Sequence, residues 1–467
     1  MTRPSIALLV VLAGCGGGGG DAGPDAALPR QLSYTPRGCG YMVSTPEVLE
    51  AEPGNAARGA QPAPTQVHVS WAGSPTSTFA VNWMSDADTK LSQVLYSTDQ
   101  ALVSAADGPA TEAGPLGHQD GHTLVYSSLF PAGETRLHEV HVCGLMADTR
   151  YFYKVGGPGA WSKVFDITTA PMAGTAGPFK FAVSGDSRDN PTIFADVQQR
   201  IAAAGPDFQL FSGDAVLLGA SEGDWRKWFD ATSTSGMAAE EVLARVPFMF
   251  ADGNHESLSQ IFLSRFALPQ ELSDGESGQG EEWYSFDYGN AHFVVLNDSV
   301  SSTTVLTGSE PTWLRADLGK VDRQKTPWIF VMHHQGAYSC ASNHGSNLAV
   351  RAALQPIYDE FKVDVVWNGH DHDYERSHPI RGFQPGSTEG ALATEGADGV
   401  PVAESGTIYI VSGGAGASLY GSSTACFHTL KAESVNNYLI VDVDGRMLRV
   451  TAYRLDGSVL DQFTYSK

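Results

Sequence analysis

The feature that most constrains the fold is a regular alternation of short apolar segments with helical segments from about residue 178 onward. Apolar stretches typical of buried strands fall at 179–184, 208–212, 246–251, 292–296, 328–332 and 363–367. Segments with helical character separate them at 191–204, 224–229, 311–318 and 348–361. Strands that alternate with helices predict a layered α/β core. Residues 437–463 predict a closing meander of strands.

A different periodicity governs residues 64–171. Residues 67–71, 79–83 and 93–96 alternate apolar with polar side chains at period two, and two more strand-like segments follow. Several short strands separated by turns predict an all-β sandwich. The segment 144–151 resembles the corner before a late strand of fibronectin type III domains, in which a tyrosine, here Tyr151, ties the turn. Because its histidines are scattered rather than clustered, we interpret this domain as a scaffold.

The first 15 residues have the layout of a secretory signal. Arg3 supplies a positive charge, and the apolar run at 6–12 is shorter than the ~20 residues that span a bilayer. Leu-Ala-Gly-Cys at 12–15 resembles the lipobox of bacterial lipoproteins, which implies export and a lipid anchor at Cys15. Secretion through an ordinary signal peptide is the alternative. Residues 16–63 predict a flexible tether and N-terminal extension, and we expect membrane contact only through the anchor.

Four cysteines remain after Cys15, and an exported protein can oxidise them. Four cysteines allow three pairings, which sequence alone does not distinguish. We favour Cys39 with Cys143 in the front part and Cys340 with Cys426 in the rear part. None of them has the spacing of a thiolate metal site.

The charge balance limits the partners of the chain. It contains 52 acidic and 29 basic residues, and its formal net charge is -23. Nucleic acid is not an expected partner, because binding its backbone needs a basic surface. The same charge repels anionic substrates at long range, so phosphate chemistry would need a strongly positive local site.

Side chains that can bind metal follow five of the predicted strands directly. They are Asp186, Asp214, Asn254 with His255, His333 with His334, and His370 with His372. Ligands of open α/β sheets bind in the crevice outside the strand carboxyl ends, and glycines before these residues allow sharp turns. Carboxylates and imidazoles together suit Zn, Fe or Mn. Each of these motifs alone is weak evidence for a metal site, since a lone Gly-Asp is usually a turn. The ordered set predicts a pair of cations.

Residues 178–467 resemble the calcineurin-like metallophosphoesterase superfamily, and the whole chain resembles purple acid phosphatases, which place a fibronectin-like domain before the catalytic one. The stretch 369–376, Gly-His-Asp-His-Asp-Tyr-Glu-Arg, is especially close to the last motif of that group. The resemblance implies a sandwich of β-sheets flanked by helices. It also assigns Asp186 and His372 to the first metal, Asn254, His333 and His370 to the second, and Asp214 to both.

Two positions depart from this pattern. The tyrosine whose phenolate binds ferric iron in purple acid phosphatases is replaced by Leu217. The histidine that the wider superfamily uses two residues after the first Asp is replaced by Arg188. We therefore expect a colourless centre with two divalent ions of Fe, Zn or Mn. Arg188 is expected either to contact the phosphate or to pair with Asp189.

The resemblance implies hydrolysis of a phosphate ester by a hydroxide that bridges two metal ions, with His255 as the general acid. His344, on the loop after the fourth motif, is a candidate for substrate contact, or else a plain loop histidine. We expect His334 to point away from the site, and Glu256 and Asp371 to orient imidazoles.

The leading interpretation is a phosphomonoesterase of the acid phosphatase type at the cell surface. Hydrolysis of phosphodiesters or nucleotides on the same site is the alternative within this chemistry. An anchored binding protein without turnover is the alternative of another class.

Overall fold

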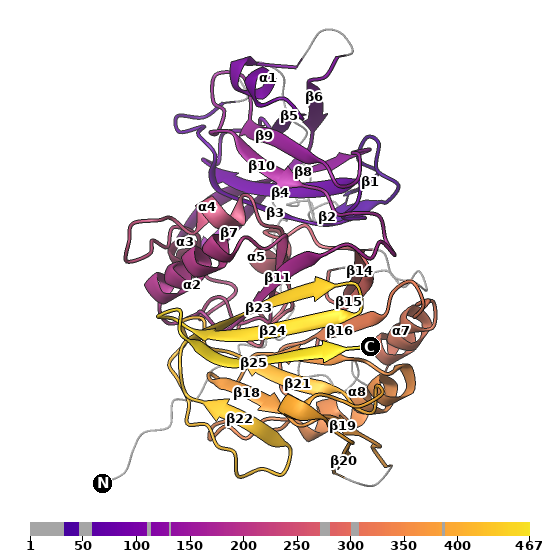
Figure 1. Cartoon of the computed structure of the whole chain (residues 1–467). Helices are drawn as coiled ribbons and strands as arrows, with labels where there is room; N and C mark the ends of the chain where they lie inside the picture. The colour runs from indigo at the N-terminus through magenta and orange to yellow at the C-terminus, as the bar shows by residue number, and fades with distance from the viewer. Residues whose placement is uncertain are drawn as a thin grey trace, which may run out of the picture.

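The computed structural model describes residues 32–45, 58–109, 114–129, 132–270, 281–299, 308–384 and 388–467. The signal segment, Cys15 and most of the predicted tether lie outside these ranges. Within them, none of the helices combines the length and the apolar character that crossing a membrane requires. Figure 1 shows an all-β body at the top and a larger body of sheets and helices below it.

The front body consists of two four-stranded antiparallel sheets. One has the order β3 (Thr65–Ser70), β4 (Thr78–Ser85), β8 (Ala132–Cys143) and β7 (His122–Leu129). The other has the order β10 (Phe165–Thr168), β9 (Arg150–Gly156), β5 (Gln93–Ser97) and β6 (Gly117–Asp120). The hydroxyl of Tyr151 accepts a hydrogen bond from the N–H of Met146 at 3.1 Å, which confirms the expected corner. The predicted all-β domain is confirmed.

Smaller elements decorate this domain. The short helix α1 (Gln100–Ala105) follows β5, and a two-stranded sheet is formed by β1 (Leu32–Tyr34) and β2 (Val43–Thr45). A disulfide joins Cys39, between β1 and β2, to Cys143 at the end of β8, with a Cα–Cα distance of 5.1 Å. The second disulfide joins Cys340 to Cys426, with a Cα–Cα distance of 5.8 Å. Both favoured pairings are confirmed.

The larger body is built on two stacked sheets. The six-stranded sheet has the order β13 (Phe248–Phe250), β12 (Phe208–Phe211), β11 (Phe179–Ser184), β23 (Asn437–Asp444), β24 (Met447–Arg454) and β25 (Val459–Ser466). The seven-stranded sheet has the order β14 (Tyr284–Tyr288), β15 (Ala291–Val295), β16 (Trp328–Met332), β17 (Val365–Asn368), β21 (Ile408–Ser412), β18 (Tyr374–Ser377) and β22 (Thr429–Glu433). The pair β19 (Ile380–Arg381) and β20 (Ala391–Leu392) stands apart.

Helices lie around these sheets, which confirms the layered α/β expectation. They are α2 (Pro191–Ala204), α3 (Glu222–Phe229), α4 (Glu240–Leu243), α5 (Gln260–Leu263), α7 (Ser309–Leu318) and α8 (Leu348–Phe361). The side chain of Asn190 caps α2 by accepting the N–H of Ile193 at 3.2 Å, and the left-handed Gly205 ends it. Asn347 caps α8 in the same way.

Strand β16 shows how the core sets the direction of the site residues. Its residues Trp328, Phe330 and Met332 belong to the large core cluster that extends through both sheets. The alternate residues Ile329 and Val331 belong to a second cluster with apolar side chains of α7 and α8. Successive side chains of a strand point to opposite faces. A residue directly after β16 therefore points either toward the other sheet or toward α7 and α8.

The front domain is packed tightly against the larger body. The side chain of Arg265 is fully buried and binds Glu222 at 2.6 Å and Gln66 of β3 at 2.9 Å. The hydroxyl of Ser70 donates to the carbonyl of Ala267 at 2.8 Å. A buried guanidinium with two polar partners fixes the position of the two bodies relative to each other.

Candidate metal centre

The chain makes strained turns where β11, β12 and β17 end. Asp186, Asp214 and His370 have φ values of 59°, 56° and 69°, which are costly for residues other than glycine. The glycines beside them leave room for the carboxylates. A Cβ at Gly253 would lie 2.4 Å from Asp214 Oδ1, and one at Gly369 would lie 2.3 Å from Asp186 Oδ2. Strain of this kind is typical of functional sites, and here it aims polar side chains into one crevice.

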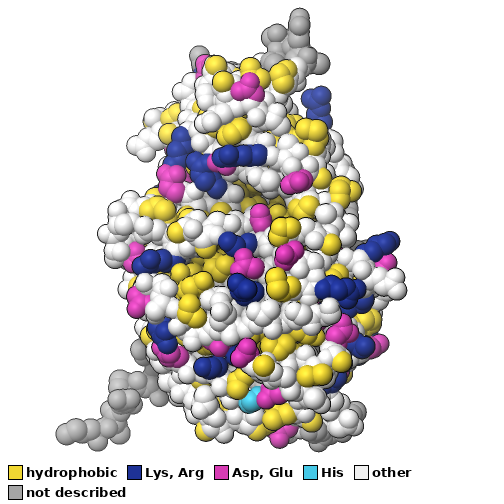
Figure 2. Space-filling view, in the orientation of Figure 1, with side chains coloured by type: hydrophobic (Ala, Val, Ile, Leu, Met, Phe, Trp, Pro, Cys, Tyr) yellow, Lys and Arg dark blue, Asp and Glu magenta, His cyan; other side chains and the backbone are white. Residues whose placement is uncertain are grey.

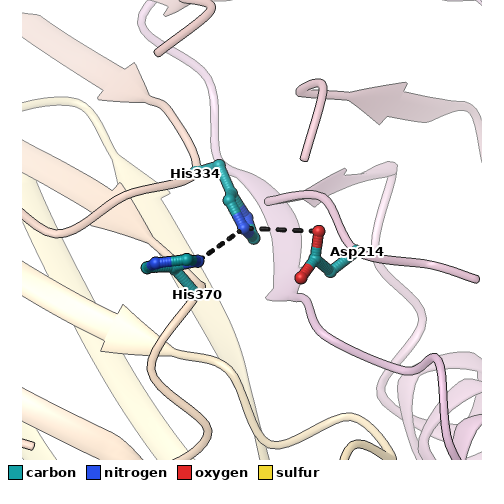
Figure 3. Close-up of side chains that lie close together, drawn as sticks. All are labelled: Asp214, His334 and His370. Carbon is teal, nitrogen blue, oxygen red and sulfur yellow. Dashed lines mark hydrogen bonds and ion pairs between the residues drawn. The ribbon is translucent and has the colours of Figure 1, made fainter. Parts of the chain in front are cut away.

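The first of two ligand groups consists of Asp214, His334 and His370, whose candidate ligand atoms all lie within 4.8 Å of one another (Figure 3). His334 Nε2 lies 3.4 Å from Asp214 Oδ1 and 3.1 Å from His370 Nδ1. It also lies 3.1 Å from Asn254 Oδ1. The other ring nitrogen of His334, Nδ1, donates to the carbonyl of Ser212 at 2.7 Å. This bond aims Nε2 at the group.

The electrostatics around His334 favour a positive charge. Burial by itself would lower the pKa of His334, but the Asp214 carboxylate outweighs it, and the pKa lies well above its usual value. Asp214, Asn254 and His370 each direct an acceptor atom toward His334 Nε2, so a proton or a metal ion can be held between them. This donor set of one carboxylate, one amide oxygen and two imidazoles fits a divalent transition metal.

The placement of the neighbouring pair His333 and His334 corrects the sequence interpretation. The predicted ligand His333 faces away from the group, because its Nδ1 bonds Asp298 Oδ2 at 2.7 Å and its ring packs near Tyr358 of α8. His334 continues the direction of Met332 toward the crevice. Residues 328–332 are all apolar, so only the packed structure shows that the even-numbered positions of this strand face the other sheet.

The second ligand group consists of Asp186, Asp214 and His372, all buried, with candidate ligand atoms again within 4.8 Å of one another. His372 Nδ1 donates to the carbonyl of Ser418 at 2.7 Å, which leaves Nε2 as the acceptor. Burial lowers the pKa of His372 to about 4, so the ring is neutral near pH 7. Asp214 belongs to both groups, as the predicted bridging residue must. The structure therefore brings together all the predicted ligands except His333.

Arg188 reaches into the second group. Its Nη1 atom lies 3.1 Å from Asp214 Oδ2 and 3.1 Å from His372 Nε2. Its Nε atom lies 3.6 Å from Asp189, which is the weaker of its two ion pairs. The side chain is only 15% exposed. The ion pair with Asp189, one of the two roles expected from the sequence, is present. The guanidinium also contacts Asp214 and His372, two of the candidate metal ligands.

His255 lies at the edge of the centre. Its backbone N–H donates to Asp214 Oδ1 at 3.0 Å, and its ring Nδ1 donates to the carbonyl of Leu217 at 2.6 Å. Nε2 lies 3.8 Å from Asp214 Oδ2. The Leu217 side chain is 56% exposed, so the position that lacks the tyrosine offers its carbonyl to His255 instead of a ligand to the metal.

Three carboxylates support the centre, in ways that differ from the expected orientation of imidazoles by Glu256 and Asp371. Glu256 accepts the backbone N–H groups of Gly253, Asp214 and Ala215 at 2.8–3.0 Å. Burial raises the pKa of Glu256 to about 8. Asp371 accepts the hydroxyl of Ser339 at 2.7 Å and the N–H of Gly345 at 3.1 Å. Both residues therefore hold backbone turns. The sequence analysis missed Asp298, which follows β15 and orients His333.

Two aromatic rings stack on ligand histidines. His344 packs on His370 with ring centroids 4.0 Å apart, and Tyr420 packs on His372 with centroids 3.9 Å apart. Their loops are joined by the disulfide between Cys340 and Cys426. His344 therefore lies beside the centre, as a substrate contact must. Tyr420 was not singled out in the sequence, because nothing before the fold relates its loop to the strand ends.

Comparison with known proteins agrees with this geometry. Residues 64–169 match the family described as the purple acid phosphatase N-terminal domain, and residues 179–374 match the calcineurin-like phosphoesterase family. The two matches follow each other in the order of purple acid phosphatases, with the N-terminal domain before the phosphoesterase domain. Members of this class hydrolyse phosphate esters with two metal ions.

The chain spans 56% and 66% of the length of the two curated relatives described next. Purple acid phosphatase 15 from Arabidopsis thaliana is 30% identical over 306 residues, which are 58% of this chain and 56% of that protein. The phosphoenolpyruvate phosphatase of Allium cepa is 27% identical over 70% of this chain and 66% of its own length. The structure of a purple acid phosphatase from yellow lupin seeds shares the fold, with a TM-score of 0.69 at 20% identity, over 86% of this chain and 74% of that one.

Proposed function

We propose that the protein hydrolyses phosphate esters, with a preference for monoesters, at a centre with two adjacent cation positions. The observation that carries the proposal is the convergence of Asp214, Asn254, His334 and His370 on one point beside Asp186 and His372. The match of residues 179–374 to the calcineurin-like phosphoesterase family supports the same chemistry.

The ligand residues and their supports have defined tasks. Bound metal would lower the pKa of a coordinated water and neutralise charge on the phosphate oxygens. Asp214 links the two positions, while Asn254, His334 and His370 complete one of them. Carbonyl oxygens of Ser212 and Ser418 fix the tautomers of His334 and His372, so that each presents a lone pair to the centre. Because Leu217 supplies no phenolate, we propose a divalent metal and a colourless protein.

His255 is the proposed general acid. Its Nδ1–H is already bonded to the carbonyl of Leu217, and this bond holds the ring with Nε2 toward the crevice. Nε2 lies 3.8 Å from Asp214 Oδ2, which places it next to the centre without making it part of either ligand group. From there it can donate a proton to the leaving alkoxide.

A pocket beside the centre has room for a small organic leaving group. It has a volume of about 250 Å³ and is lined by Arg188, Leu217, Lys227 and Trp228 among others. Its two cationic residues, Arg188 and Lys227, each lie within ion-pair distance of an acidic lining residue, Asp189 and Asp224 respectively. On the face seen in Figure 2, basic and acidic side chains are interspersed, and no broad basic patch is seen there.

We also propose that the protein is exported and anchored to the cell envelope through lipid on Cys15. The sequence pattern at residues 12–15 supports this location. Metabolic labelling with a radioactive fatty acid tests it, because Cys15→Ser would abolish the label if the anchor is real. Label that persists in Cys15→Ser would refute the lipid site.

The enzymatic proposal is tested by assaying 4-nitrophenyl phosphate and bis(4-nitrophenyl) phosphate with purified protein of known metal content. We expect faster hydrolysis of the monoester, no visible phenolate-to-iron absorption band, and loss of activity in Asp214→Asn. A faster diester reaction would reassign the substrate class. Bound metal without turnover on either ester would support a binding protein instead.

A further inference from the structure

The guanidinium of Arg188 competes directly with a metal ion for one ligand atom. The Nη1 atom donates toward His372 Nε2 and Asp214 Oδ2, each at 3.1 Å. The Nδ1 atom of His372 is bonded to the Ser418 carbonyl at 2.7 Å and therefore carries the proton. A neutral imidazole then has a single lone pair, at Nε2, which can accept an Arg N–H or bind a metal but not both.

Arg188 is held in this place by more than two contacts. Tyr420, whose ring stacks on His372 with centroids 3.9 Å apart, is a further neighbour of the guanidinium. Asp189 lies 3.6 Å from its Nε atom, and the side chain is 15% exposed. These contacts and the low exposure already restrict the side chain. Holding it beside His372 therefore costs less conformational entropy than ordering a free surface arginine would.

The two cation positions are unequal in their ligands. The position around His334 has four ligand groups, from Asp214, Asn254, His334 and His370. The other has Asp186, His372 and the shared Asp214. A catalytic zinc site uses three protein ligands and an open position for water, so this second position has no ligand to spare. With an Arg188 N–H on His372 Nε2, only Asp186 and Asp214 remain for a metal.

We propose that the guanidinium of Arg188 is the cation of this second group, so that the resting centre contains one metal ion and one arginine. This inference rests on the proposed phosphoesterase function and specifies its cofactor content. The metal is bound at the His334 position. The guanidinium compensates the charge of the Asp214 carboxylate.

The test is elemental analysis of purified protein after dialysis against buffer with micromolar zinc. Wild-type protein should retain about one metal ion per chain, whereas Arg188→His should retain about two, because an imidazole adds a ligand and frees His372 Nε2. Arg188→Ala should also gain a second, more weakly bound ion, which isothermal titration with zinc would reveal. Arg449→His is the matched control, since it adds an exposed histidine on β24 far from the centre.

The outcomes separate this inference from the function on which it rests. Two tightly bound ions per wild-type chain would overturn the inference, and with active enzyme they would leave the phosphoesterase proposal standing. No bound metal, together with no hydrolysis, would overturn both. A second ion in Arg449→His would show that any added histidine captures zinc, and a gain in Arg188→His would then count against the inference. The wild-type stoichiometry decides the matter even if the Arg188 variants fail to fold.

Discussion

The Nε2 atom of His334 lies 3.1 Å from the Nδ1 atom of His370, although the two residues follow different strands of the same sheet. His334 follows β16, and His370 follows the adjacent parallel strand β17. The distance is a consequence of register, because Met332 pairs with Trp367 and both strands end at the same edge. Two ring nitrogens this close form a site for a cation, and the Asp214 carboxylate beside them supplies the opposite charge.

The first prediction separates the two adjacent histidines. His334→Ala should lose the metal and reduce turnover by roughly a thousandfold or more, because it removes a ligand. His333→Ala should keep the metal but unfold more easily, since it leaves the buried Asp298 carboxylate without its imidazole. Metal analysis and thermal denaturation of both variants check this. Metal lost only from His333→Ala would restore the original sequence assignment.

The second prediction concerns His255. His255→Ala should slow hydrolysis of alkyl phosphates by about a hundred- to ten-thousandfold, because the leaving alkoxide needs a proton. Hydrolysis of 4-nitrophenyl phosphate should fall much less, since nitrophenolate leaves without help. The metal content should stay at the wild-type level, because only the backbone N–H of His255 bonds Asp214 at hydrogen-bonding distance. Equal losses on both substrates would argue against a role as the acid.

The third prediction concerns the disulfide between Cys340 and Cys426. It joins the loops that carry His344 and Tyr420, so replacing both cysteines with serine should raise KM while the bound metal remains. Stability should also fall by about 2–4 kcal/mol. The same double replacement at Cys39 and Cys143 is the control, because that bridge lies in the front domain. It should lower stability without changing KM; an equal rise in KM in both variants would contradict the assignment.

The fourth prediction is a pH dependence of stability. His292 bonds Asp287 at 2.7 Å and Asp317 at 2.9 Å. Burial opposes protonation, but these carboxylates raise the pKa of His292 to about 9. The folded pKa thus exceeds the unfolded value of about 6.5, so the contribution is complete below pH 6.5 and lost as pH rises toward 9.

Replacing this residue removes that contribution. His292→Gln should lower the free energy of unfolding on the order of 3 kcal/mol at pH 6, and the difference from wild type should shrink by pH 9.5. Urea denaturation at the two pH values measures it. A difference that is the same at both values would mean that His292 acts through packing alone.

The sequence predicted the elements better than the directions of individual side chains. Helices α2 and α8 were expected with the bounds that the structure gives, because caps and periodicity are local signals. Strands β14, β18, β21 and β22 were not anticipated. All four are short. The partners of β18, β21 and β22 are distant in sequence, whereas β14 forms a hairpin with the adjacent β15.

The site residues show the same division. Motif glycines and strand ends pointed to Asp186, Asp214, Asn254 and His370, and the structure places these four residues in one crevice. The choice between His333 and His334 depended on which face of β16 meets the other sheet, which is decided by tertiary packing. The contact of Arg188 with His372 joins segments 184 residues apart, so no local pattern could reveal it.

Anomalous diffraction from crystals of the purified protein, at the absorption edge of its bound metal, tests the central claim most directly. The account predicts a strong peak about 2.0–2.3 Å from Asp214, Asn254 Oδ1, His334 Nε2 and His370 Nδ1. A peak bound by His333, or no peak in this crevice in an enzyme that hydrolyses phosphate esters, would contradict it.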